Sequence, residues 1–61
     1  MNIKITNKTS RQTGTRTEIE YSSYIARSIS DCRDGVDAMA YEIACEHGQV
    51  VTLGQVTAEP A

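Results

Sequence analysis

The segment that most restricts the fold of this chain runs from Asp34 to Gly48 and reads DGVDAMAYEIACEHG. Its larger apolar residues recur at spacings of three and four, which is typical of one buried helix face. These residues are Val36, Met39, Ala40, Ile43 and Ala44, and His47 continues the row. Asp34 is of a type that caps helix N-termini, and Gly48 is of the type that ends helices. The sequence therefore predicts one amphipathic helix over about residues 34–47.

The size of the chain limits how much core this helix can help to bury. With 61 residues, a domain buries only about 60% of the surface that its unfolded chain exposes. The chain has three Tyr and neither Trp nor Phe, so aliphatic side chains must fill the interior. Cores of this size usually need a disulfide, a metal or a partner chain for added stability. We expect one small domain over residues 1–61.

Two alternating segments before the helix predict a β-hairpin. Ile3 and Ile5 alternate with polar residues, and the segment TRTEIEY repeats the pattern with Ile19 and Tyr21. Period-two alternation indicates half-buried strands. Residues 7–16 between them are polar and predict a loop. A hairpin centred on Gln12 would place Ile5 opposite Ile19 and Ile3 opposite Tyr21.

The remaining segments complete a small α+β domain. Residues 49–56 are rich in β-branched side chains and predict a strand, whereas the tail after them is expected to fray. Residues 23–33 fit a strand or a helix; extended structure that leads into a helix is slightly favoured, and both alternatives stay open. We expect an antiparallel sheet of the N-terminal hairpin plus the C-terminal strand, with residues 24–30 as a further strand under one alternative, packed against the helix. The expected core comprises Ile3, Ile5, Ile19, Tyr21, Val36, Met39, Ile43 and some of Val50, Val51, Leu53 and Val56.

Two cysteines and the single histidine are the only candidates for metal binding or nucleophilic chemistry. Positions 45 and 47 of a helix project about 160° apart, so Cys45 and His47 point away from each other. Helical rise separates Cys32 from Cys45 by roughly 15 to 20 Å, which is too far for a disulfide or a shared metal. We therefore expect no metal, no cofactor and no catalytic residue, and hence a protein that is not an enzyme. His47 is expected to stabilise the end of the helix through its exposed carbonyl groups.

A second apolar face of the helix predicts a protein interface. Ala38, Tyr41 and Cys45 recur at spacings of three and four, almost opposite Val36. A domain of this size is too small to cover its helix on both sides, so this face suggests a surface that a partner covers. The expected function is self-association or binding of another protein, and Tyr41→Glu is predicted to dissociate the complex.

The charge distribution suggests an alternative, which is nucleic-acid binding through the hairpin loop 7–16. The net charge is −2, with a balance of +3 over residues 1–27 and −5 over residues 28–61. Lys8, Arg11 and Arg16 lie in or beside that loop, and a two-stranded ribbon can enter a major groove and contact phosphates. A solvated loop is the simpler interpretation, because no aromatic residue is interleaved for base stacking.

The stretch SISDCRDGVDAMAYEIACEHGQVVTLGQV resembles the strand, Asp-rich turn, helix and strand of small uncharacterised accessory proteins encoded by bacteriophages and prophages. The resemblance covers about half of the chain and implies a compact α+β domain that binds a host or phage macromolecule. It assigns no functional residue. The N-terminus lacks the features of a signal peptide, and no stretch approaches the roughly 18 apolar residues of a membrane span, so a cytoplasmic protein without a membrane partner is expected.

Overall fold

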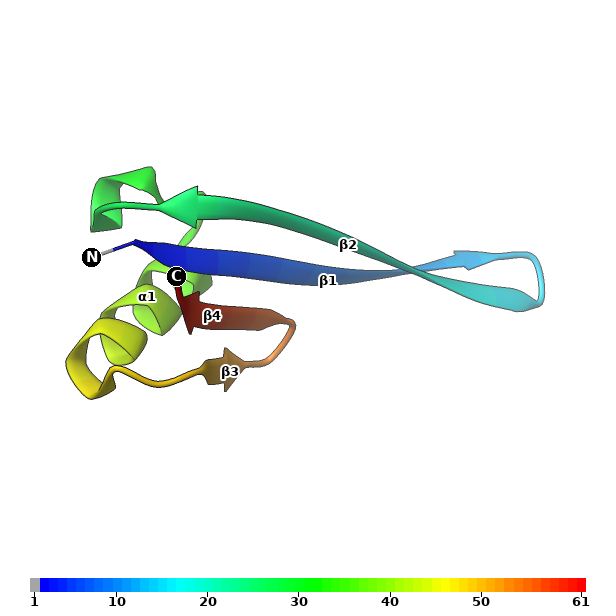
Figure 1. Ribbon diagram of the computed structural model, residues 1–61. Coiled ribbons are helices and arrows are strands. Elements are labelled where there is room, and N and C mark those ends of the chain that lie inside the picture. Colours follow the sequence, from blue (N-terminus) through cyan, green and yellow to red (C-terminus); the bar gives the residue numbers. More distant parts are fainter. Residues whose placement is uncertain (1) are drawn as a thin grey trace.

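The structure, a computed structural model that describes residues 2–61, has a four-stranded antiparallel sheet with one helix against it (Figure 1). The elements in chain order are β1 (Ile3–Thr13), β2 (Arg16–Ala26), the 3₁₀ turn η1 (Ile29–Asp31), α1 (Gly35–His47), β3 (Val51–Leu53) and β4 (Val56–Pro60). The strand order in the sheet is β2-β1-β4-β3. The expected α+β class is confirmed.

Strands β1 and β2 form a hairpin whose register differs from the expected one. Thr13 pairs with Arg16, so the turn consists of two residues, and Gly14 supplies the positive φ of 64° that such a turn requires. Ile5 consequently lies opposite Tyr24, not Ile19. The expected register, centred on Gln12, is wrong. Because the actual turn shifts the pairing by an odd number of residues, it also moves Ile19 to the sheet face opposite Ile5.

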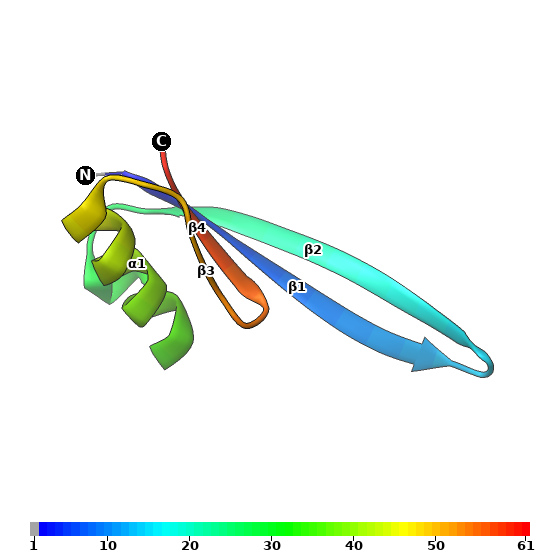
Figure 2. The ribbon, with the colours of Figure 1, turned by 90° about the horizontal axis from the view of Figure 1, so that it is seen from below.

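The outer part of this hairpin extends beyond the rest of the molecule as a twisted ribbon (Figures 1 and 2). β4 pairs with β1 only along Ile3–Asn7, and the Lys8 N–H donates to the Gln55 carbonyl oxygen at 2.8 Å. Residues 9–20 beyond that point, here called the arm, pair only with each other. The described chain is accordingly long and narrow, 41 × 19 × 18 Å. Most of the expected loop 7–16 is therefore strand.

The C-terminal segment forms a second hairpin rather than one strand and a frayed tail. β3 and β4 are joined by a turn at Gly54 and Gln55, and β4 lies between β3 and β1. Ala58 pairs with Ile5 on one side and with Val51 on the other. The expectation of a frayed tail is wrong because β1 supplies the pairing partner that holds β4 in the sheet.

Helix α1 has the expected bounds and both expected terminal residues. The Asp34 Oδ1 accepts hydrogen bonds from the backbone N–H groups of Val36 and Asp37 at 2.9 and 3.1 Å. At the other end Gly48 adopts a left-handed conformation, and its N–H donates to the Ala44 carbonyl oxygen at 2.8 Å. The helix prediction is confirmed because its start and stop signals act locally.

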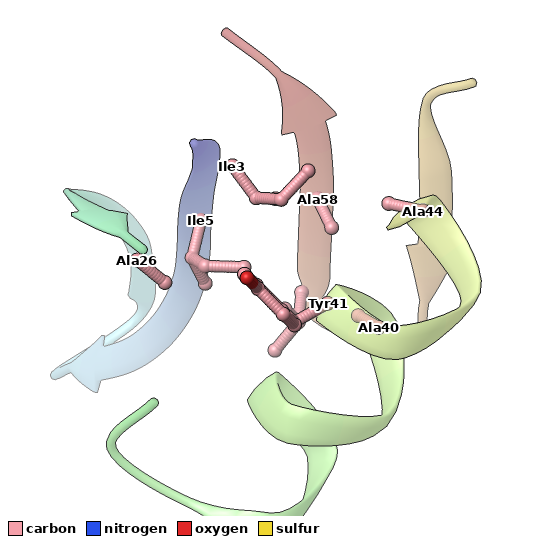
Figure 3. Close-up of a cluster of buried hydrophobic side chains, with 8 residues drawn as sticks. Ile3, Ile5, Ala26, Ala40, Tyr41, Ala44 and Ala58 are labelled. Carbon is pink, nitrogen blue, oxygen red and sulfur yellow. The ribbon is translucent and has the colours of Figure 1, made fainter. Parts of the chain in front are cut away.

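The face that α1 turns to the sheet matches the expected one only in part, because Ala40 and Ala44 are buried as expected whereas Val36 and Met39 are not. Its buried residues are Asp37, Ala40, Tyr41 and Ala44. By contrast Val36 and Met39, which were expected in the core, are 48% and 57% exposed, and His47 is also exposed. The alanines let the helix approach the sheet closely, and the Tyr41 side chain fills the remaining space near Ile5 (Figure 3). Tight packing of small residues around one aromatic ring thus sets the rotation of the helix.

The core is small and draws on both hairpins and the helix. It comprises Ile3, Ile5, Ala26, Ala40, Tyr41, Ala44, Val56 and Ala58. Burial of Ile3, Ile5 and Val56 confirms part of the expected core. Ile43, Val51 and Leu53 are half-buried, whereas Ile19, Tyr21 and Val50 are exposed. The expected core is therefore correct at the base of the hairpin and wrong on its outer half.

The ambiguous segment 23–33 contains both extended and helical structure. β2 continues to Ala26, and η1 follows as a single 3₁₀ turn. The Arg27 N–H donates to Asp31 Oδ2 at 2.8 Å, which closes the chain reversal between β2 and the helix. This order of elements agrees with extended structure that leads into a helix, and neither a strand nor a helix spans the whole segment.

Candidate functional site

An exposed apolar row on β2 is the most conspicuous surface feature of the structure. Because side chains alternate across a strand, Ile19, Tyr21 and Ile25 lie on the sheet face opposite buried Ile3 and Ile5. α1 covers the other face, so these three side chains are 48%, 68% and 48% exposed. We call them the β2 row.

Two lysines border the β2 row. Lys4 lies directly opposite Ile25, and Lys8 lies directly opposite Tyr21. Their long side chains can cover apolar surface while the ammonium groups stay in water. The uncovered sheet face is thus apolar along β2 and basic along β1.

The outer edge of β2 is open. β2 lies at one end of the sheet and pairs only with β1 within residues 2–61. Its register with β1 is continuous over 11 residues and contains no bulge, and the strand carries neither proline nor lysine. Bulges, prolines and lysines are among the devices by which proteins protect long edge strands, and the charged residues of β2, which are Arg16, Glu18 and Glu20, all lie in its outer half. β2 therefore presents a row of unpaired backbone groups beside an apolar row, and this combination is the candidate site.

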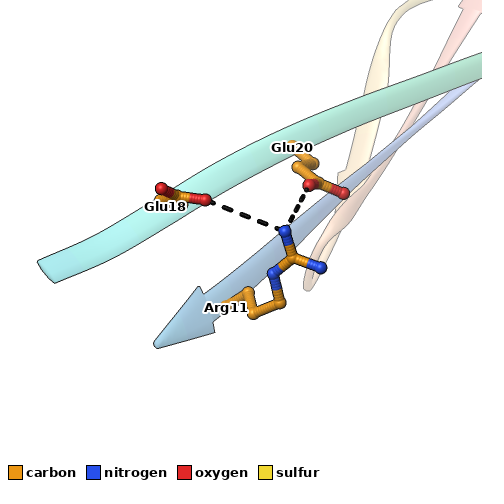
Figure 4. Close-up of polar contacts among 3 residues, drawn as sticks. All are labelled: Arg11, Glu18 and Glu20. Carbon is orange, nitrogen blue, oxygen red and sulfur yellow. Dashed lines mark ion pairs between the residues drawn. The ribbon is translucent and has the colours of Figure 1, made fainter. Parts of the chain in front are cut away.

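The charges of the arm are partly neutralised on the face of the ribbon opposite the β2 row. Arg11 lies 3.2 Å from Glu20 and 3.8 Å from Glu18, measured between guanidinium nitrogen and carboxylate oxygen (Figure 4). All three side chains are at least half exposed. Exposed ion pairs of this kind contribute about 0 to 1 kcal/mol each to stability. They matter more for the surface potential than for stability.

The residues expected to contact nucleic acid do not gather on one face. Lys8 shares the uncovered face with the β2 row, whereas Arg11 and Arg16 lie on the opposite face of the ribbon. Arg11 is also engaged by two carboxylates. The structure thus separates the three residues that the sequence grouped.

The residues expected to form a protein interface lie on the core side of α1. Tyr41 is 7% exposed, and its hydroxyl donates to the Arg27 carbonyl oxygen at 2.9 Å. Burial raises the pKa of Tyr41 above its ordinary value, with a smaller contribution from Cys45. Ala38 and Cys45 are half-buried. The expected exposed face is wrong, because the sheet of the same chain already covers its central residue.

A buried carboxylate links β2 to the start of α1. Asp37 is 2% exposed, and its Oδ2 accepts a hydrogen bond from the Tyr24 hydroxyl. The Tyr24 hydroxyl in turn accepts from the Arg33 backbone N–H at 3.1 Å, and the Arg33 guanidinium lies 4.3 Å from the centre of the Tyr24 ring. Asp37 Oδ1 has no hydrogen-bond partner within residues 2–61. The network fixes the end of β2 against the helix.

This network predicts a loss of stability at alkaline pH. Burial, followed by the hydrogen bond to Asp37, raises the pKa of Tyr24 from 10.0 to about 12. Below pH 10 the contribution of the protonated hydroxyl is fully present. Between pH 10 and 12 the unfolded chain has lost this proton while the folded chain keeps it, so the free energy of unfolding falls as pH rises. Urea unfolding followed by circular dichroism at several pH values measures this slope.

Tyr24→Phe is expected to reduce that slope. At pH 8 the variant should also be less stable by about 1 to 3 kcal/mol, because buried Asp37 loses its hydrogen bond. Tyr21→Phe is the matched control, since Tyr21 is exposed, and it should leave both quantities unchanged. Equal slopes for the unmodified chain and Tyr24→Phe would contradict the assignment of the alkaline loss of stability to Tyr24.

The two thiols are poorly placed for nucleophilic chemistry. Cys32 and Cys45 are free, and each is half-buried against the core. Burial raises the pKa of the Cys32 thiol, and the charges of Asp37, Asp31 and Asp34 raise it further. A raised pKa lowers the fraction of reactive thiolate at neutral pH. No group of three His, Cys, Asp or Glu residues within the described chain is placed to hold a metal ion.

A groove of about 460 Å³ lies between the start of α1 and the β3–β4 turn. Its lining includes Val36 and Met39, the two helix residues that were expected in the core, together with Leu53 and Val56. Asp34 is the one ionisable residue of the lining, and its carboxylate already caps α1. The groove holds no set of groups suited to acid–base or nucleophilic catalysis.

Comparisons with protein-family models, curated proteins and solved structures find no match to this chain. Within residues 2–61, α1 is too short and too polar to cross a lipid bilayer.

Proposed function

We propose that this protein is a non-enzymatic accessory protein that acts by protein–protein interaction through β2. One observation carries the proposal, namely the apolar β2 row beside a strand edge that is unpaired within residues 2–61. An exposed sheet edge binds a further strand by main-chain hydrogen bonds, and neighbouring side chains supply specificity. The resemblance of the second half of the chain to phage and prophage accessory proteins agrees with this kind of role.

The β2 row supplies the apolar contribution to such binding. Clustered apolar side chains on the surface of a small protein mark interaction sites, whereas scattered single ones do not. Ile19 and Tyr21 lie one side-chain repeat apart, and Ile25 continues the same face at the base of the hairpin. Lys4 and Lys8 place two positive charges beside the row, which favours a partner with acidic residues at the rim of its interface.

Affinity capture from cells that naturally contain the protein tests this proposal. The triple variant Ile19→Thr, Tyr21→Thr and Ile25→Thr keeps strand-forming residues but removes the apolar row. We expect it to lose partners that the unmodified chain retains. The control variant Val36→Thr with Met39→Thr removes exposed apolar surface from the groove instead, and it should retain them. Retention by both variants would exclude β2 as the binding surface.

Nucleic-acid binding through the arm is the competing proposal. The arm is a two-stranded ribbon, which is a shape that fits the major groove of DNA. Titration of labelled duplex and single-stranded DNA at low salt separates the two functions. Binding that weakens in Lys8→Ala, Arg11→Ala and Arg16→Ala, with a reduced salt dependence, would favour nucleic acid over protein as the partner.

A further inference from the structure

We propose that the partner of β2 is β2 of a second copy, paired antiparallel about a two-fold axis. This inference rests on the proposed function and names its partner. It joins the two sheets edge to edge in the order β3-β4-β1-β2-β2-β1-β4-β3. A second copy offers the same 11-residue edge, so the pairing is self-complementary and closes with two chains.

The arm supplies the physical reason for such a partner. Residues 9–20 form a two-stranded ribbon without a third strand, and an isolated two-stranded hairpin is only marginally stable in water. In an antiparallel β2 pair, the arm half of each β2 lies beside the base half of the other. Each arm thereby gains a third strand along part of its length.

Charge and apolar pairing favour the register in which Ser22 lies on the two-fold axis. Residues 18–26 of one copy then pair with residues 26–18 of the other, and Ile19 lies opposite Ile25 of the second copy. With Glu20 on the axis, the two Glu20 side chains would face each other. With Ile19 on the axis, Glu18 would face Glu20. Like charges directly opposite each other destabilise a pair of strands.

The same register brings opposite charges together. Glu20 of the second copy comes to lie opposite Tyr24, on the sheet face that α1 covers. The Arg33 guanidinium already lies over the Tyr24 ring, 4.3 Å from its centre, and it makes no ion pair within residues 2–61. The pairing therefore places Arg33 on each side of the axis beside Glu20 of the second copy, whose carboxylate also lies 3.2 Å from Arg11 of its own chain.

Packing of two uncovered sheet faces is the other symmetric arrangement, and charge opposes it. On that face Lys4 lies between Ile25 of β2 and Glu59 of β4, and Lys8 lies opposite Tyr21. Face-to-face packing would remove their ammonium groups from water next to the same groups of the second copy, which is costly. Edge pairing leaves both lysines at the solvent-exposed surface.

Sedimentation equilibrium over a range of protein concentrations measures the association directly. We expect a species of twice the 6.7 kDa chain mass at high concentration. Glu20→Arg should raise the dimer dissociation constant at least about tenfold, because it places an arginine of the second copy beside each Arg33. Adding Arg33→Glu to Glu20→Arg should restore association, whereas Arg33→Glu alone should weaken it.

Cysteine cross-linking tests the register independently. In a chain carrying Cys32→Ser and Cys45→Ala, Ser22→Cys places two thiols opposite each other at the axis, within the Cα separation that a disulfide tolerates. Mild oxidation should convert this variant to a covalent dimer. Ser23→Cys, one residue away, should not cross-link because residue 23 faces Tyr21 of the second copy. Circular dichroism verifies that the chain without Cys32 and Cys45 folds. The Glu20→Arg and Arg33→Glu variants keep both cysteines and therefore test the association independently of this background.

The outcomes separate this inference from the proposed function. A monomer at every concentration overturns the inference, and β2-dependent capture of another protein would then leave the proposed function intact. A dimer that cross-links through residue 23 and not residue 22 overturns the register. A monomer whose captured partners do not depend on β2 overturns both.

Discussion

Ile5→Ala is expected to remove most of the stability of this domain. Ile5 is fully buried, and it lies between Tyr24 and Ala58 in the centre of the sheet and beneath α1. Replacing a buried isoleucine by alanine costs about 2 to 5 kcal/mol, because the chain loses apolar burial and leaves a cavity. Small domains have total stabilities near the lower end of about 5 to 15 kcal/mol. Urea unfolding followed by circular dichroism measures the loss.

Ile19→Ala is the matched control for this substitution. The register expected from the sequence paired Ile19 with Ile5. Under that register both alanine variants would lower the free energy of unfolding equally. In the structure Ile19 lies opposite Ser10 and is 48% exposed. We expect a loss below about 1 kcal/mol, since little burial is removed. Similar losses for the two variants would contradict the turn at Gly14 and Thr15.

Tyr41→Ala is expected to destabilise the domain about as much as Ile5→Ala does, but for a different reason. The Tyr41 ring is the one large side chain that α1 places in the core, and its hydroxyl bonds the Arg27 carbonyl oxygen. Truncation of a buried aromatic residue to alanine costs about 3 to 5 kcal/mol. Tyr41→Glu would place a carboxylate in the same position, so it should unfold the chain rather than dissociate an oligomer.

Met39→Ala tests the rotation of the helix. Met39 belongs to the face that the sequence pattern assigned to the core, yet it is 57% exposed. We expect its truncation to change the free energy of unfolding by less than about 1 kcal/mol. A large loss for Met39→Ala together with a small loss for Tyr41→Ala would show that the helix presents the opposite face.

The candidate site was partly visible in the sequence. The alternation of TRTEIEY continues through Ile25, and this row of odd-numbered residues is the signal that marks the β2 row. The pattern alone assigns these residues to a common face without saying whether that face is buried. Only the pairing with β1 shows that they lie on the exposed sheet face, on the other side of the sheet from Ile3 and Ile5.

The position of the C-terminal strand could not be predicted from local sequence preference. Residues 57–60 have few strong strand formers, and local preference favours a frayed end. In the structure β4 lies between β1 and β3, and Ala58 is fully buried. Pairing with a strand more than 50 residues away in the chain (Ile3 with Pro60, for example) is a long-range interaction that overrides local preference.

Local interactions let the sequence by itself determine helix α1, its Asp34 cap, its Gly48 terminus and the α+β class. These features depend on residues within a few positions of each other, so no distant contact is needed to specify them. The tertiary structure alone decided the hairpin register, the rotation of α1 and the place of β4, because each depends on the packing of segments far apart in the chain. For the same reason, only the tertiary structure showed that Tyr41 belongs to the core and that the open surface lies on β2.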